Sequence, residues 1–136
     1  MTREELNKYI ESIGGLVNSW YPDREPIMHC PCNIGEGWFQ LIHDLMEELL
    51  EAGWDKHIKQ IKEKFGGLRF YIGSGNEKIW EIISKYESFS YTICEKCGKS
   101  GELRKDGGKR GRWWQTLCDK HYNEIKKIQK KNERGH

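Results

Sequence analysis

Apolar side chains recur at helical spacing in three segments of the first 90 residues. The first segment begins after Thr2, which forms a capping box with Glu5, and ends at Gly14-Gly15. The second covers about residues 36–52 and ends at Gly53, and the third covers about residues 77–90 behind Asn76 as N-cap. The apolar faces of the three helices consist of Leu6, Tyr9, Ile10 and Ile13; of Trp38, Leu41, Ile42, Leu45 and Leu49; and of Ile79, Ile82, Ile83 and Tyr86.

A β-hairpin is predicted between the second and third helices. Its second limb, residues 68–72, alternates strictly, with Leu68, Phe70 and Ile72 on one face. Gly66-Gly67 permits the positive φ values of a tight turn. The first limb, residues 57–65, alternates poorly, so its register stays open. Residues 16–35 contain three prolines and are expected to be irregular.

The last third of the chain contains the spacing of a metal site. Cys94-x2-Cys97-Gly98 is followed by Cys118-x2-His121, and zinc favours four such ligands in a tetrahedron. A hairpin is predicted between the pairs, through Leu103-Arg104 and residues 113–116, and a helix after Cys118 bears Tyr122, Ile125 and Ile128 on one side. A knuckle, a hairpin and then a helix carrying the second pair resemble a treble-clef zinc finger.

Two other interpretations of these cysteines fit the sequence less well. A thioredoxin-type redox pair requires a helix directly after C-x2-C, whereas Gly98 and a charged hairpin follow here. A treble-clef nuclease requires a catalytic histidine on the hairpin, and the sequence has none between Cys97 and Cys118. Because four protein ligands leave no position for water, we expect one structural Zn²⁺ ion and no catalysis by it.

The charge of the chain is divided unevenly. Residues 1–93 hold 10 Lys and Arg against 15 Asp and Glu, whereas residues 94–136 hold 13 against 6, although the whole chain of 136 residues has a net charge of only +2. Basic and aromatic side chains together are typical of surfaces that contact phosphates and stack on bases. The candidates in the last third are Arg104, Lys105, Lys109, Arg110, Arg112 and one of Trp113 or Trp114. The alternative is a solvated hairpin tip with one tryptophan packed on the zinc module.

A second candidate surface lies on the first hairpin. Lys64, Arg69 and Tyr71 would share its outer face beside Gly66-Gly67, where glycine amides and cations could hold a phosphate. The segment lacks the Gly-Lys-Ser/Thr ending of a P-loop, so the alternative is a tight hairpin with a basic outer face.

Other histidines, cysteines and carboxylates give weaker signals. Cys30 and Cys32, next to His29, could bind a second metal or be buried thiols. A metal-dependent hydrolase using His29, His43 or His57 is a third class of function that remains open. The acidic run of Asp44, Glu47 and Glu48 is typical of a solvent-facing helix and is not expected to be catalytic.

The sequence shows no run of about 20 apolar residues of the kind that spans a membrane. The first five residues, Met1–Glu5, are charged at once and lack the apolar stretch of a signal peptide. The protein is therefore expected in the cytoplasm, without a membrane partner, where its five cysteines stay reduced unless a metal binds them.

Three motifs in this order resemble a family of small uncharacterised proteins from phages and bacterial genomes. They are Gly37-Trp38-x2-Leu41-Ile42, the segment Ile61–Tyr71 with sequence IKEKFGGLRFY, and the terminal C-x2-C-G…C-x2-H. The resemblance spans residues near 28–121 and carries no residue-level activity. It implies a phage or prophage setting, hence the cytoplasm of the host cell, and a protein that binds nucleic acid or inhibits a host factor.

We therefore expect an α+β protein, with a body of three helices and a hairpin in residues 1–91 and a treble-clef zinc module in residues 92–136, packed as one unit. The favoured function is that of a non-enzymatic, zinc-stabilised binding protein whose basic module contacts nucleic acid or a nucleotide-like anion. The alternative is a protein-interaction factor, such as a phage inhibitor of a host enzyme or defence system, which could form a homodimer.

Overall fold

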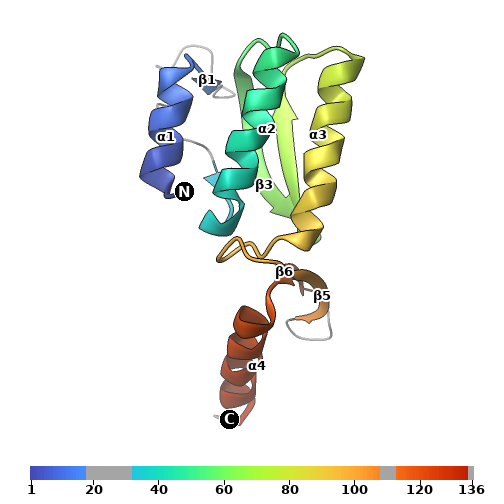
Figure 1. Cartoon of the computed structure of the whole chain (residues 1–136). Helices are drawn as coiled ribbons and strands as arrows, with labels where there is room; N and C mark the ends of the chain where they lie inside the picture. The colour runs from blue at the N-terminus through green and yellow to red at the C-terminus, as the bar shows by residue number, and fades with distance from the viewer. Residues whose placement is uncertain (18–31, 108–112, 135–136) are drawn as a thin grey trace.

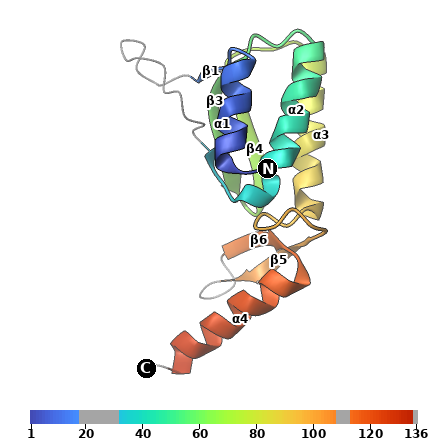
Figure 2. The same cartoon turned by 60° about the vertical axis from the view of Figure 1, so that its left-hand side comes forward.

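The computed structural model describes residues 1–17, 32–107 and 113–134 and has an α+β architecture (Figures 1 and 2). Four α-helices accompany two antiparallel hairpins in this part of the chain. The elements are α1 (Arg3–Ser12), β1 (Leu16–Val17), β2 (Cys32–Asn33), the 3-10 turn η1 (Glu36–Trp38), α2 (Phe39–Glu51), β3 (His57–Lys64), β4 (Gly67–Ile72), α3 (Glu77–Phe89), the 3-10 turn η2 (Ser90–Thr92), β5 (Glu102–Gly107), β6 (Trp113–Leu117) and α4 (Asp119–Arg134).

The predicted helix ends are confirmed by their local hydrogen bonds. Thr2 and Glu5 form both bonds of the capping box, and the Asn76 side chain accepts a hydrogen bond from the backbone N–H of Ile79. Gly14 and Gly53, just after α1 and α2, have φ values of +73° and +86°, which an L side chain adopts only with strain. The second helix differs in one respect, because its first turn is the 3-10 turn η1.

The main sheet has four strands, two more than the sequence predicted. β3 pairs antiparallel with β4, while the short strands β1 and β2 pair parallel with the opposite edge of β3. The expectation that residues 16–35 are irregular is therefore wrong at both ends. Two-residue strands leave no readable alternation, and they form only because β3 offers a free edge.

The turn of the β3–β4 hairpin lies one residue earlier than the double glycine suggests. Phe65 and Gly66 occupy it with φ values of +54° and +82°, and Gly67 already belongs to β4. Two consecutive positive φ values define a type I′ turn. Gly67 is required for another reason, since a Cβ atom there would collide with the ring of Tyr91.

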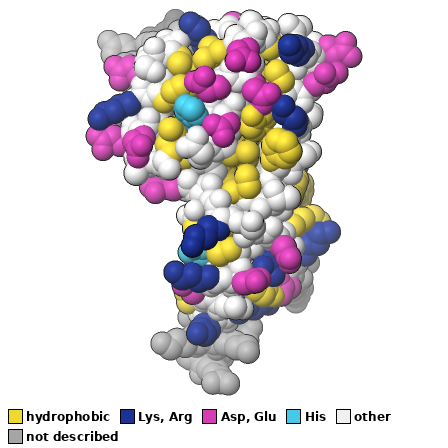
Figure 3. Space-filling view, viewed as in Figure 1, with side chains coloured by type: hydrophobic (Ala, Val, Ile, Leu, Met, Phe, Trp, Pro, Cys, Tyr) yellow, Lys and Arg dark blue, Asp and Glu magenta, His cyan; other side chains and the backbone are white. Residues whose placement is uncertain are grey.

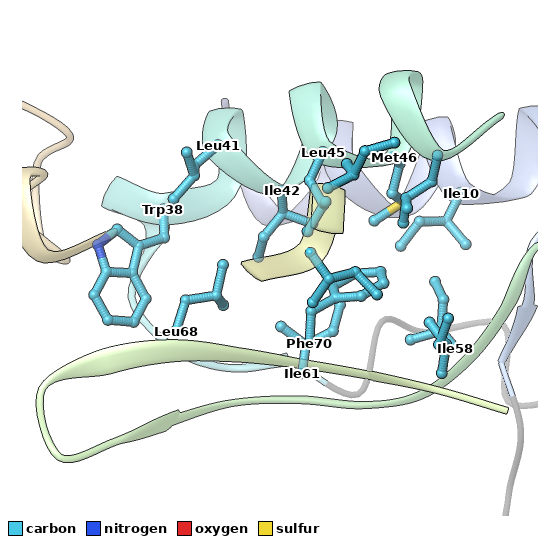
Figure 4. Packing of buried hydrophobic residues seen from close by; sticks show 14 of the residues in the cluster. Ile10, Trp38, Leu41, Ile42, Leu45, Met46, Ile58, Ile61, Leu68 and Phe70 are labelled. Carbon is cyan, nitrogen blue, oxygen red and sulfur yellow. The ribbon is translucent and has the colours of Figure 1, made fainter. Parts of the chain in front are cut away.

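α1, α2 and α3 cover one face of the sheet, and the core lies between them (Figures 1 and 4). Leu68, Phe70 and Ile72 point into it from β4, as their alternation predicted. Figure 4 shows Trp38 at one end of this core, with its indole extending toward the module. The predicted apolar face of α2 is buried, as are Leu6 and Ile10 of α1, whereas Tyr9, Ile13 and Tyr86 are only partly buried.

Body and module are joined by hydrogen bonds from two separate parts of the body. Around η1, Gly37 N–H donates to Glu95 O (2.7 Å), Gly35 N–H to the Glu95 carboxylate (2.9 Å), and Trp38 Nε1 to Ile93 O (2.8 Å). At the hairpin turn, the hydroxyl of Thr116, a fully buried residue, donates to Gly66 O (2.7 Å). These contacts support the expectation that the two parts pack as one unit.

The surface charge follows the division seen in the sequence. Carboxylates predominate on the helical face of the body, whereas Lys and Arg are frequent below the junction (Figure 3). None of the helices in the described residues combines the length and apolar character needed to cross a bilayer.

Substituting Gly37 tests the junction. A Cβ atom at this position would press against the carbonyl oxygens of Cys94 and Glu95, so we expect Gly37→Ala to lower the free energy of unfolding by about 2–3 kcal/mol. The neighbouring exposed variant Glu36→Ala is the control and should change it by less than about 0.5 kcal/mol. Urea unfolding monitored by tryptophan fluorescence measures both, and equal stability of the two variants would contradict the described packing.

Candidate metal centre

The first ligand pair lies in a tight knuckle between η2 and β5. Gly98 N–H donates to Cys94 O (2.9 Å) and Cys94 N–H to Lys99 O (2.7 Å), so the chain reverses within six residues. Gly98 has the predicted positive φ, +81°, and a Cβ atom there would lie 3.1 Å from Gly37 O. A glycine is therefore required both by the turn and by the approach of the body.

The second pair lies where β6 runs into α4. Cys118 follows the last residue of β6, and His121 belongs to the first turn of α4, where Tyr122 N–H donates to Cys118 O (2.9 Å). Leu117, Tyr122 and Ile125 pack around the cysteines, while Ile128, predicted on the same side, is 58% exposed. The helix thus points the His121 ring at the knuckle.

The four ligand atoms lie close enough together to surround one metal ion. All lie within 4.8 Å of one another. The sulfurs of Cys97 and Cys118 are 3.8 Å apart, and Nδ1 of His121 lies 3.6 Å from the Cys94 sulfur and 3.2 Å from the Cys118 sulfur. Zn–S and Zn–N bonds at tetrahedral angles give edges of about 3.8 Å and about 3.6 Å. Cys94, Cys97, Cys118 and His121 can therefore hold one Zn²⁺ ion.

The protein environment favours thiolates at two of the three sulfurs. Burial alone would raise the pKa of Cys94, but backbone N–H groups directed at its sulfur outweigh burial and leave the pKa below its usual value. The backbone N–H of His121 donates to the Cys118 sulfur (3.5 Å) and lowers the pKa of that thiol. Desolvation raises the pKa of Cys97. Backbone dipoles thus prepare the site for a cation.

Arg104, the first of the predicted ligand-binding residues, is engaged within the module. Its guanidinium donates to the Asp119 carboxylate (2.7 Å) and to Leu117 O (3.3 Å) and lies over the Tyr122 ring (4.3 Å). Only 17% of its side chain is exposed. Arg104 therefore holds α4 against β5.

The two predicted tryptophans point to opposite faces of the β5–β6 hairpin. Trp113, 46% exposed, lines a small cavity beside α4 with Ile125 and Lys126. Trp114 faces the body, with Lys105 lying over its ring at 4.8 Å and Phe65 meeting it edge-on at 6.0 Å. Lys109, Arg110 and Arg112 lie outside the described residues.

The outer face of the main sheet carries the second predicted surface. Lys62 pairs with Arg69 across the strands, and its ammonium lies 5.4 Å from the centre of the Tyr71 ring. Lys64 lies over the Phe65 ring at 5.7 Å. The guanidinium of Arg69 bonds to Leu68 O (2.9 Å) and Tyr91 OH (3.3 Å). The sequence segment considered for phosphate binding begins at Lys62 and so included its ammonium group, but sequence reasoning gave Phe65 no role.

The two candidate surfaces therefore meet, because Phe65 of the body contacts Trp114 of the module. We call the combined surface the ring–cation strip. It consists of Lys62, Lys64, Phe65, Tyr71, Lys105 and Trp114.

The residues considered for hydrolase chemistry lie elsewhere. His43 contacts Asp44 (3.0 Å), Glu47 (3.8 Å) and the Tyr9 ring between α1 and α2, whereas His57 begins β3. His29 and Cys30 lie outside the described residues, and Cys32 belongs to β2. Among residues 1–17, 32–107 and 113–134, only the Cys94 cluster groups three or more side chains that could hold a metal.

No protein-family model matches this chain, and no match is found among curated proteins or solved structures. Its function is therefore inferred from its own residues.

The metal centre predicts one zinc ion per chain. Native mass spectrometry of the purified protein should show one bound Zn²⁺, and Cys94→Ser should lose it, because three ligands hold zinc far more weakly than four. The matched control is Cys30→Ser, which removes a cysteine outside the ligand set and should keep the ion. Zinc retained by Cys94→Ser and lost from Cys30→Ser would place the metal elsewhere.

Proposed function

We propose that this protein is a non-enzymatic, zinc-stabilised protein that binds nucleic acid or a nucleotide-like anion along the ring–cation strip. The observation that carries the proposal is the contact of Phe65 with Trp114, which joins the two basic surfaces into one. Phosphates are bound by cations and bases by aromatic rings, and the strip offers both along a single path.

The cations of the strip are available to an anion. Lys62, Lys64 and Lys105 form no ion pair within the described part of the chain, and the contacts of their ammonium groups there are with aromatic rings. By contrast, Arg104, Lys85 and Lys126 are each bound to a carboxylate. A phosphate that binds these three lysines would therefore not have to displace a carboxylate of the described residues from them. Lys109, Arg110 and Arg112, which follow β5 in the sequence, would add to the charge.

The zinc ion in this proposal is structural, and residues 92–134 form a treble clef around it. The order of knuckle, β5–β6 hairpin and α4 supports this assignment, as does a ligand set supplied wholly by the protein. The metal would supply no reaction chemistry. It would hold β6 in place, and β6 positions Trp114.

A protein-interaction factor is the second candidate. Trp80 and Phe89, 45% and 46% exposed on α3, support it, since large exposed aromatic residues are enriched at protein interfaces. The helical face of the body is rich in carboxylates (Figure 3), so this activity would use the opposite charge from the strip. In both cases, the resemblance to phage proteins suggests an action inside a host cell.

The salt dependence of binding tests the favoured function. We expect the full-length, zinc-loaded protein to bind fluorescently labelled oligonucleotides, with log K falling linearly against log salt concentration. Replacing Lys62, Lys64 and Lys105 together by alanine should weaken binding at least about tenfold and reduce the slope by about 2, because each lost phosphate contact removes about 0.7–0.9.

Lys78→Ala is the control for this measurement. Lys78 is an exposed lysine of α3, and its removal should leave the slope nearly unchanged. Fluorescence anisotropy at four or five salt concentrations gives both slopes. Absence of binding at low salt, or the wild-type slope in the triple variant, would contradict the proposal.

A further inference from the structure

We infer that the ligand of the ring–cation strip is single-stranded nucleic acid, with an unpaired base stacked on Phe65 beside Trp114. This inference rests on the proposed function and adds the class of ligand. It follows from three observations on Phe65: its backbone conformation, its exposure and its neighbours.

The backbone of Phe65 is strained. Its φ of +54° lies in the left-handed region, which costs a bulky L residue roughly 1–2 kcal/mol. The first position of a type I′ turn ordinarily takes Asn, Asp or Gly, which avoid most of this cost. The turn itself therefore gains nothing from a phenylalanine.

The Phe65 ring also gains little from burial. It is 62% exposed, the highest value among the large hydrophobic side chains of the described residues. Its described aromatic contact is a single edge-on approach to Trp114, worth about 0.5–1.5 kcal/mol. A strained backbone that presents an exposed ring is consistent with a binding role for that ring.

The neighbours of Phe65 suit a nucleotide chain. Lys64 lies over the Phe65 ring, 5.7 Å from its centre, and Lys105 lies over the neighbouring indole ring of Trp114 at 4.8 Å. A base stacked on the other face of Phe65 would thus have two ammonium groups nearby for the adjoining phosphates. The carboxylate of Glu63, in the same turn, is held by the backbone N–H of Gly66 (3.0 Å).

Stacking on a protein ring requires a base with a free face. In a duplex both faces of each base are covered by its neighbours, so aromatic platforms select unpaired bases. The shared chemistry of single-stranded DNA and RNA fits the strip equally, because base stacking and phosphate contacts do not depend on the sugar.

The test uses the full-length, zinc-loaded protein and three labelled probes: oligo-dT and oligo-rU of 16 nucleotides and a 16-base-pair DNA duplex. Anisotropy at one salt concentration should show tighter binding of either single strand than of the duplex. Phe65→Asn should weaken single-strand binding about 5- to 100-fold, the effect of losing one stacked base. Its melting temperature should stay the same or rise, because asparagine is favoured at this position of the turn.

Two further variants separate stacking from packing. Phe65→Tyr keeps the ring and should bind the single strands as the wild type does, and Phe89→Ala removes an exposed phenylalanine outside the strip and should leave binding unchanged. Wild-type single-strand affinity in Phe65→Asn would overturn the inference while leaving phosphate binding intact. A fall in its melting temperature, with the same loss of binding in Phe65→Tyr, would assign the ring to packing and also overturn it. Failure of all three probes to bind would instead refute the proposed function.

Discussion

The structure depends on the close approach of two backbones at the junction of body and module. Gly37 and Gly98 face each other there, and the carbonyl oxygens of Cys94 and Glu95 lie where a side chain on Gly37 would be. Because neither glycine has a side chain, Gly37 N–H reaches Glu95 O, and the Trp38 indole reaches Ile93 O. Any larger residue at these positions would separate the knuckle from the body.

This approach links the metal to the rest of the protein. Cys94 carries a zinc ligand on its side chain, and its backbone neighbours Ile93 and Glu95 accept the hydrogen bonds from the body. An ion that fixes the knuckle thus also fixes the acceptors for the first turn of α2. The same module places β6 against the β3–β4 turn, where Thr116 is bonded to Gly66. We therefore expect the Phe65–Trp114 contact of the strip to depend on both the Gly37–Glu95 and the Thr116–Gly66 hydrogen bonds.

Three glycine-containing motifs of the sequence converge at this junction. Gly37-Trp38, Phe65-Gly66-Gly67 and Cys94-x2-Cys97-Gly98 are far apart in the sequence, yet each contacts another of the three or the strand β6. The first and third of these motifs meet directly. Gly37, Gly67 and Gly98 are thus explained by close packing of the fold, whereas the exposed ring of Phe65 has no such explanation.

The sequence predicted correctly those parts of the structure whose conformation depends on residues close together in the chain. The capping box at Thr2, the Asn76 cap, the alternation of β4 and the Gly98 knuckle are of this kind. The four ligands were also predictable, because their spacing is set by the geometry of zinc. β1 and β2 were missed because each consists of two residues held by the edge of β3.

The candidate binding site was predicted only in part, for a similar reason. Composition identified Lys64, Tyr71, Lys105 and Trp114, but no sequence pattern shows that Phe65 meets Trp114 across nearly 50 positions. The sequence also does not show that Arg104 donates a hydrogen bond to Asp119 and lies over the Tyr122 ring. Contacts between distant segments depend on the assembled fold, and this chain forms them at the junction.

Hydrogen exchange at the Gly35 and Gly37 amides tests the dependence of the junction on the metal most directly. Both N–H groups donate to Glu95, so they should exchange slowly in the zinc-loaded protein and much faster after chelation, while the Lys62 and Arg69 amides, which face each other across β3 and β4, stay protected in both states. Equal protection of Gly35 and Gly37 with and without zinc would show that the body holds the knuckle unaided, and would contradict this account.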